Sequence, residues 1–160
     1  MEKGGRMERI DKLPPQAKEV ERAVLGALLL EKDALLQIAN IINRESFYDP
    51  KNALVFDAIK QLDIENKPID LLTVTEQLKK ADKLDKIGGR AYLAELMSNV
   101  ASAANITNHA KIVKEKAIQR EIIKLSNEVC SKAYEGTYTI DELMPLLTTG
   151  VTDLLKETTD

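Results

Sequence analysis

Residues 105–134 contain neither glycine nor proline, and this limits the possible folds of the chain more than any other feature. Glycine and proline are the residues that most weaken a helix interior, so the stretch predicts one helix, roughly 45 Å long at ~1.5 Å per residue. Gly136 is a natural end for it. Apolar residues recur at steps of three and four, as on one helix face. They are Ile106, Ala110, Val113 and Ala117, and then, one residue out of phase, Ile118, Ile122, Leu125 and Val129.

The predicted long helix has a second apolar face, and a second helix follows it in the sequence. Ile112 and Ile123 lie outside the stripe, so two sides of the long helix are apolar. Residues 139–142, which read Thr-Ile-Asp-Glu, fit a capping box that opens a further helix. Pro145 falls inside that helix and should kink it or delay its regular start. The short turn between the helices predicts an antiparallel hairpin. The stripe of the return helix is Ile140, Leu143, Leu147, Val151 and Leu154.

The second apolar face has two interpretations, and the pattern alone does not choose between them. The face either covers the rest of the chain or contacts a partner. The preceding residues supply a candidate for the first interpretation, because they read as a bundle of short helices. β-branched residues are too scattered there to indicate a sheet. We therefore predict an all-α chain with a tail at 1–12, a globular helical head at 13–104 and a helical hairpin at 105–157.

Local signals place the helices of the head. Pro14 and Pro15 end the tail and begin the first helix, and Asp33 caps a second. Further starts are predicted at Asn52, as a cap, and at 73–76, as a capping box. The glycine pair at 88–89 opens the last short helix, at 91–97.

Composition excludes several classes of function. Aromatic residues make up 4% of the chain and Trp is absent, so the core must consist of Leu, Ile, Val and Ala. A formal net charge of −3 does not suit a dedicated duplex-DNA binder, which needs many cations for phosphate. The longest apolar run, 23–30, is much shorter than a ~20-residue membrane span. Cys130 is the single cysteine, which fits a reducing, cytoplasmic setting.

No set of residues indicates catalysis. The sequence has neither a P-loop nor a G-x-G-x-x-G motif. His109 is the only histidine and has no second ligand at metal-binding spacing. Cys130 lies in the predicted long helix and is interpreted as a packed residue, and Glu19 and Glu21 are interpreted as surface acids. We therefore predict a binding domain and no enzyme in this chain.

A row of cations on the long helix leaves one alternative. Lys116, Arg120 and Lys124 stand four residues apart, with Lys111 and Lys114 nearby. Such a face could bind single-stranded nucleic acid as a helical module. Because Glu115, Glu121 and Glu128 partly neutralise it, we favour a solvated face, with direct nucleic-acid contact weak or absent.

An ordered series of motifs resembles the N-terminal domain of the bacterial replicative DNA helicase, the DnaB family. The series extends over about residues 13–124 and ends in Arg120. Two positions depart from the family pattern: the family often has His at the position of Asn52 and Tyr at that of His109. The motifs are LPPQ (13–16), EVERAVLGALL (19–29), FY (47–48), LVFDAI (54–59), PIDLLTVT (68–75), GGRAYLAEL (88–96), AANI (103–106) and IVKEKA (112–117).

The resemblance implies a non-catalytic interaction domain that acts in DNA replication. The ATPase motor would follow after Asp160, so ATP and Mg²⁺ are expected only there. Hairpins would pair between subunits, as a dimer or as a trimer of dimers in the hexamer, and form an N-terminal collar. The implied partners are the C-terminal domain of a DnaG-type primase and, as a further candidate, a helicase loader.

Two sets of residues follow from the resemblance. The set expected to bind the primase is Glu19, Tyr92, Arg120, Ile123 and Val129, in which an aromatic and exposed aliphatic side chains would form the anchor. The set expected to mediate self-association is Ile112, Val113, Ile122, Leu143, Leu147 and Val151.

Overall fold

The structure, a computed structural model, describes residues 13–158 and is all-helical over them, which confirms the predicted fold class. The predicted tail at 1–12 lies outside the described residues. The α-helices are α2 (Lys18–Leu30), α3 (Ala34–Ile38), α4 (Pro50–Ile64), α5 (Leu71–Lys80), α6 (Arg90–Ser98), α7 (Ile106–Glu135) and α8 (Ile140–Thr158). Two 3-10 turns, η1 (Arg44–Ser46) and η2 (Asp85–Ile87), connect them.

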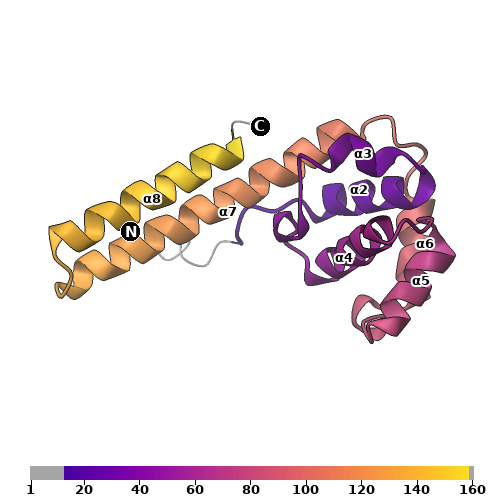
Figure 1. The fold of residues 1–160 in the computed structure, drawn as a ribbon, viewed down its shortest axis with the longest axis horizontal. Coiled ribbons are helices and arrows are strands. Elements are labelled where there is room, and N and C mark those ends of the chain that lie inside the picture. The colour runs from indigo at the N-terminus through magenta and orange to yellow at the C-terminus, as the bar shows by residue number, and fades with distance from the viewer. Residues whose placement is uncertain (1–12, 159–160) are drawn as a thin grey trace, which may run out of the picture.

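The helices form two visibly different parts (Figure 1). Helices α2 to α6 gather into a rounded head, and α7 extends from it as a long rod. Helix α8 returns along α7 in the opposite direction and contacts it, which gives the predicted antiparallel hairpin. We call α2 to α6 with η1 and η2 the head, and α7 with α8 the hairpin.

Helix α7 belongs to both parts. Its first turns pack against α2, α3 and η1, and Ile106, Ala110 and Val113 are buried in the core of the head. No residue of α7 after Val113 is buried to that degree. Full burial of α7 side chains in the core of the head therefore ends about two turns into the helix. The division of the chain at residue 105 stays a prediction.

The turn between α7 and α8 follows the sequence prediction closely. Helix α7 ends at Gly136, whose φ of 71° is the left-handed conformation that glycine adopts without strain. The carboxylate of Glu142 accepts hydrogen bonds from the backbone N–H and the hydroxyl of Thr139. These bonds lower the pKa of Glu142. Pro145 does not delay the helix, because α8 begins at Ile140 and continues to Thr158 with the proline inside it.

Two helix starts in the head differ from the prediction. Helix α4 begins at Pro50, and its cap is Asp49, which accepts from the N–H of Lys51; the predicted cap, Asn52, is buried inside the helix. Helix α5 is capped by Asp70, which accepts from the N–H of Thr73 at 2.8 Å. Thr73 is therefore the third residue of the helix rather than its cap.

The first helix also begins later than predicted. Helix α2 starts at Lys18, so Pro14 and Pro15 precede it as a connecting segment. Ala17 occupies the cap position and makes no side-chain hydrogen bond there.

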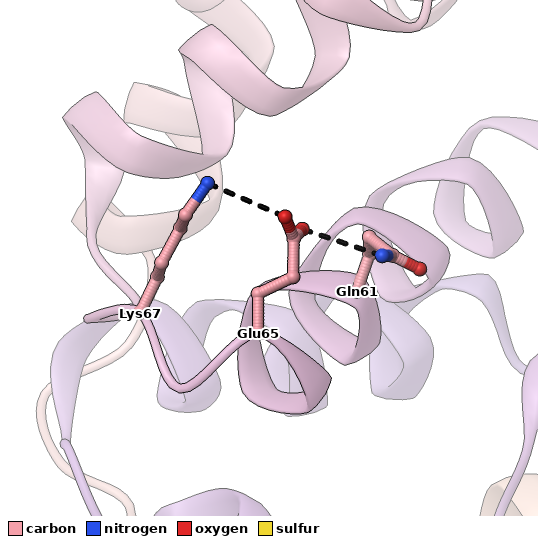
Figure 2. Close-up of polar contacts among 3 residues, drawn as sticks. All are labelled: Gln61, Glu65 and Lys67. Carbon is pink, nitrogen blue, oxygen red and sulfur yellow. Dashed lines mark hydrogen bonds and ion pairs between the residues drawn. The ribbon is translucent and has the colours of Figure 1, made fainter.

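A small polar cluster shapes the turn from α4 to α5 (Figure 2). The Glu65 carboxylate accepts from Gln61 Nε2 and from Lys67 Nζ, each at 3.3 Å. These two hydrogen bonds, that of Gln61 first, lower the pKa of Glu65. Asn66, which lies between Glu65 and Lys67 in the sequence, has a φ of 57°, a left-handed conformation that Asn tolerates better than most residues. The turn leads the chain into α5, on the far side of the head from the hairpin (Figure 1).

Helices α2 and α6 cross closely because Gly26 has no side chain. A Cβ atom on Gly26 would lie 2.3 Å from the carbonyl oxygen of Leu96 and 2.6 Å from a methyl group of Val100. Backbone cannot rotate away as a side chain can. The crossing of these two helices therefore depends on a glycine at this position.

We expect Gly26→Ala to lower the free energy of unfolding by about 1–3 kcal/mol, the usual cost of overpacking. An exposed helix position would instead gain about 1 kcal/mol from the same change. Urea denaturation followed by circular dichroism measures the difference. Gly150→Ala is the control, because its Cβ would meet the movable side-chain end of Leu125, and we expect a smaller loss there. Equal stability of Gly26→Ala and the parent chain would contradict the close crossing.

Candidate functional site

A buried carboxylate lies where three helices of the head meet. Glu21 is 1% exposed, although it is charged, and its oxygens are fully engaged. Oε2 accepts from the backbone N–H of Tyr48 at 2.7 Å. Oε1 accepts from the backbone N–H of Asp49 at 3.2 Å and from Asn52 Nδ2 at 3.0 Å. A buried carboxylate is tolerated only with such a set of donors.

The network continues from α4 into α6. Asn52 is fully buried and uses its amide in both senses, because Nδ2 donates to Glu21 and Oδ1 accepts from the hydroxyl of Tyr92. The Tyr92 ring is covered on one face by Lys51, whose Nζ lies 4.4 Å from the ring centroid. Burial raises the pKa of Tyr92 to about 12, so the hydroxyl keeps its proton and remains a donor.

Arg120 of α7 joins the hairpin to this region. Its Nη1 donates to the carbonyl of Pro15 at 2.8 Å, and its Nη2 donates to the carbonyl of Ser46 at 2.9 Å. The guanidinium carbon lies 5.4 Å from the centroid of the Tyr48 ring. Burial lowers the pKa of Arg120 and the charge of Glu21 raises it, so the two groups are electrostatically coupled. We call Glu21, Tyr48, Asn52, Tyr92 and Arg120 the junction network.

Local structure presents the two carbonyls that Arg120 binds. Ser46 ends η1, and its Oγ accepts from the backbone N–H of Asn43 at 3.0 Å, which closes this short turn. Pro15 lies at a bend in the segment before α2 and carries no N–H of its own. Both carbonyls lie beyond the ladder of any α-helix and are free to accept from a side chain.

Helix α8 has two apolar faces, only one of which packs on α7. Leu143, Leu146 and Leu154 are partly buried, and Gly150 lies so close to Leu125 of α7 that its Cβ would be 2.4 Å from Leu125 Cδ1. Helical spacing places a second set of apolar residues about a quarter turn away, and all of them are exposed. This outer face of α8 consists of Ile140, Met144, Leu147, Val151 and Leu155.

The set predicted to bind a partner falls into two groups. Glu19 and Ile123 are exposed and Val129 is half-buried, so these three are accessible. Tyr92 is only 8% exposed, which corrects its expected place in the anchor: its ring packs in the core and its hydroxyl binds Asn52. Arg120 is half-buried and already engaged with two carbonyls.

The set predicted to self-associate needs similar corrections. Ile112, Ile122, Leu147 and Val151 are exposed, as such a surface requires. Val113 is 1% exposed and belongs to the core of the head. Leu143 is half-buried and, by helical spacing, lies on the face of α8 that packs against α7. The stripe read from the sequence mixed the two faces of α8.

Sequence reasoning missed the buried role of Glu21, which we had interpreted as a surface acid. A signal for it was present, because Glu21 lies three and four residues before the buried Val24 and Leu25 and thus on the same helix face. Cys130 also differs from its interpretation as a packed residue, since it is exposed.

Other candidate chemistry finds no support in the part of the chain that the structure describes. Residues 13–158 contain no group of three or more His, Cys, Asp or Glu arranged to hold a metal ion. Within the same residues, each helix is too short or too polar to cross a membrane. Of the basic row, Lys111 and Lys124 are exposed, but Arg120, at its centre, donates to carbonyls of its own chain.

We expect Glu21→Ala to lower the free energy of unfolding by roughly 3–5 kcal/mol, because the loss of one member of a buried charged set leaves its partners unsatisfied. Glu19→Ala is the matched control, since Glu19 is exposed on the same turn of α2 and its loss should cost within about 0.5 kcal/mol. Thermal and urea denaturation of both variants measure the difference. A similar small effect in both would contradict the network.

Comparison with known proteins adds to this geometry. Residues 13–115 match the family model described as the DnaB-like helicase N terminal domain. The replicative DNA helicase DnaB of Rhodothermus marinus is 41% identical over 133 residues, which are 83% of this chain but 14% of that protein. The chain thus spans a small part of that relative's length.

Two solved structures have the same fold. The N-terminal domain of DnaB helicase from Mycobacterium tuberculosis superposes with a TM-score of 0.84 at 34% identity, covering 88% of this chain and 99% of that one. The N-terminal domain of DnaB helicase from Helicobacter pylori, described together with its interactions with primase, has a TM-score of 0.61 at 26% identity, covering 72% and 89%. The chain belongs to the family of DnaB-like helicase N-terminal domains.

Proposed function

We propose that this chain is an interaction domain of a replicative DNA helicase, which pairs with a second copy through its hairpin and docks the C-terminal domain of a DnaG-type primase. The observation that carries the proposal is the apolar surface that the hairpin leaves uncovered. Ile122 and Ile123 on α7 are 47% and 45% exposed, and the outer face of α8 is exposed throughout. A contiguous apolar surface of this kind is typical of a binding site.

The outer face of α8 is the better candidate for pairing with a second copy. Its five apolar side chains follow helical spacing over most of α8, so a helix of another subunit can lie along them. A two-fold axis would bring the same face of each copy together, as in most homodimers. We include Ile112 and Ile122 of α7 in the proposed pairing surface. We exclude Val113, which is buried, and Leu143, which is half-buried.

The second exposed side of α7 is the proposed primase surface. Ile123 lies about 100° around the helix from Ile122 and so faces another side of α7. Ile123 would be the anchor and Glu19 would lie at the polar rim. Val129 lies, by helical spacing, on the side of α7 that carries Ile122, so it would contact the primase only at the edge of this surface. The described interactions of the Helicobacter pylori domain with primase support this choice of partner.

Further proposals concern the assembled helicase. The paired domains would form a collar as a trimer of dimers, and a helicase loader is a second candidate partner. ATP and Mg²⁺ would act in the motor domain of the helicase rather than in this domain, and the location would be the cytoplasm. These proposals rest on the family alone, and none of the contacts described above supports them directly.

Leu147→Asp should weaken self-association by about tenfold or more, because pairing would bury an unpaired charge in the centre of the outer face. Sedimentation velocity over a range of concentrations measures the shift toward the monomer. Thr149→Asp is the matched control, since it adds the same charge at an exposed position on another side of α8. If both variants sediment like the parent chain, the outer face is not the pairing surface.

Ile123→Asp should weaken binding to the primase C-terminal domain by about tenfold or more, as expected for a central anchor. Isothermal titration calorimetry gives the affinity, and far-ultraviolet circular dichroism checks that the helix content is unchanged. Ile64→Asp is the control, because Ile64 is also an exposed isoleucine but lies on the head. Equal loss of affinity in both variants would argue against a specific site on α7.

A further inference from the structure

The attachment of the hairpin to the head has two separate parts. Apolar packing in the core holds the first turns of α7, and Val113 is the last fully buried residue of this helix. About two turns further along, Arg120 contacts the head again through hydrogen bonds. A helix that is held at only one place can swing about it. The second attachment therefore bears on the angle at which the rod leaves the head.

The bonds of Arg120 join segments that are distant in the sequence. Pro15 precedes α2 and lies 105 positions from Arg120, and Ser46 ends η1 and lies 74 positions away. Two different nitrogens of one planar guanidinium make the two bonds, so their directions are fixed relative to each other. Movement of α7 relative to either segment would lengthen at least one of them.

Glu21 holds the surface on which the guanidinium lies. Its carboxylate binds the backbone N–H of Tyr48, and the ring of Tyr48 stacks with Arg120. Its negative charge also favours the guanidinium in this half-buried place. Asn52 Nδ2 donates to Oε1 of the same carboxylate, and the hydroxyl of Tyr92 in turn donates to Asn52 Oδ1. The orientation of α7 thus depends on a network that reaches α6.

We propose that Arg120 and Glu21 are positioning residues: they set the angle between hairpin and head, and they act on partner docking through that angle rather than by touching the partner. The second part of this inference, the effect on partner docking, rests on the proposed function. It gives Arg120 and Tyr92, both first assigned to the partner surface, a different role. Their polar atoms are already bound within the chain, whereas Ile123, one turn after Arg120, is free to be contacted.

The test measures the angle without any partner. Cys130 is exposed on α7 and accepts one spin label, and Ala94→Cys on the exposed side of α6 accepts the second. Double electron–electron resonance then reports the distance distribution between hairpin and head. An excess of unlabelled Cys130→Ser chain removes distances between copies. The variants to compare are Arg120→Gln, Arg120→Lys and the control Lys124→Gln, which removes an exposed charge one turn further along α7.

Arg120→Gln should broaden the distance distribution, while Lys124→Gln should leave it as in the parent chain. Arg120→Lys separates charge from geometry, because lysine keeps the positive charge but has a single nitrogen for two carbonyls. We expect it to broaden the distribution as Arg120→Gln does. Circular dichroism and melting curves confirm that each variant is folded. A distribution in Arg120→Gln as narrow as in the parent would overturn the proposal.

Primase binding by the same variants tests the second half. Arg120→Gln and Arg120→Lys should weaken binding of the primase C-terminal domain by about tenfold, because a surface that is no longer preorganised must be ordered on binding. Unchanged affinity with a broadened distribution would overturn the link between angle and docking. If the parent chain itself does not bind the primase domain, the proposed function fails, and the distance distributions alone decide the role of Arg120.

Discussion

A single buried carboxylate organises the region where the parts of this molecule meet. Removing Glu21 from water is costly, and the cost is offset only because two backbone N–H groups, an amide and a nearby guanidinium surround it. Each of these donors comes from an element that must then be in its proper place. The N-terminal end of α4 and Asn52 within that helix are positioned relative to α2 by hydrogen bonds to this one group, and its charge favours the guanidinium of Arg120 nearby. Tyr92 extends the same constraint to α6.

The head encloses its apolar side chains, whereas the hairpin leaves many of its own exposed. Inside the head, apolar side chains from several helices cover one another and leave a continuous core. In the hairpin, two helices can cover only one face each, and the sequence supplies apolar residues for more than one face of both. An exposed apolar surplus of this kind is typical of interaction surfaces. This contrast between a closed core and an open hairpin underlies the functional proposals above.

The parts of this fold that depend on local spacing could be predicted from the sequence. The length of α7, its end at Gly136, the return of α8 and the helix after the glycine pair at 88–89 all follow from residues within a few turns. The assignment of α8 residues to its two faces failed, because a stripe of apolar residues does not reveal which edge meets the neighbouring helix. Val113 was misplaced for the same reason: only the docking of α7 on α2 and α3 decides that it is buried.

The junction network could not be predicted, since its bonds join residues that lie from 27 to 105 positions apart. Asn52 looked like a helix cap because Asn favours caps, but the demand of Glu21 for a buried donor overrides that preference. Tyr92 and Arg120 carry side chains typical of binding surfaces, and their burial becomes visible only in three dimensions. The family resemblance identified important positions without revealing what each side chain contacts.

The continuity of α7 from the core of the head to the hairpin turn makes it a lever. The helix extends about 22 Å beyond Arg120 at ~1.5 Å per residue, with no break at which bending would be absorbed. A tilt of about 10° at the base would therefore displace the far end by about 4 Å, as follows from that length. Such a shift is comparable to the spacing of successive side-chain rows on a helix. A small change in the angle of α7 can thus change which residues of the outer face align with a neighbouring molecule.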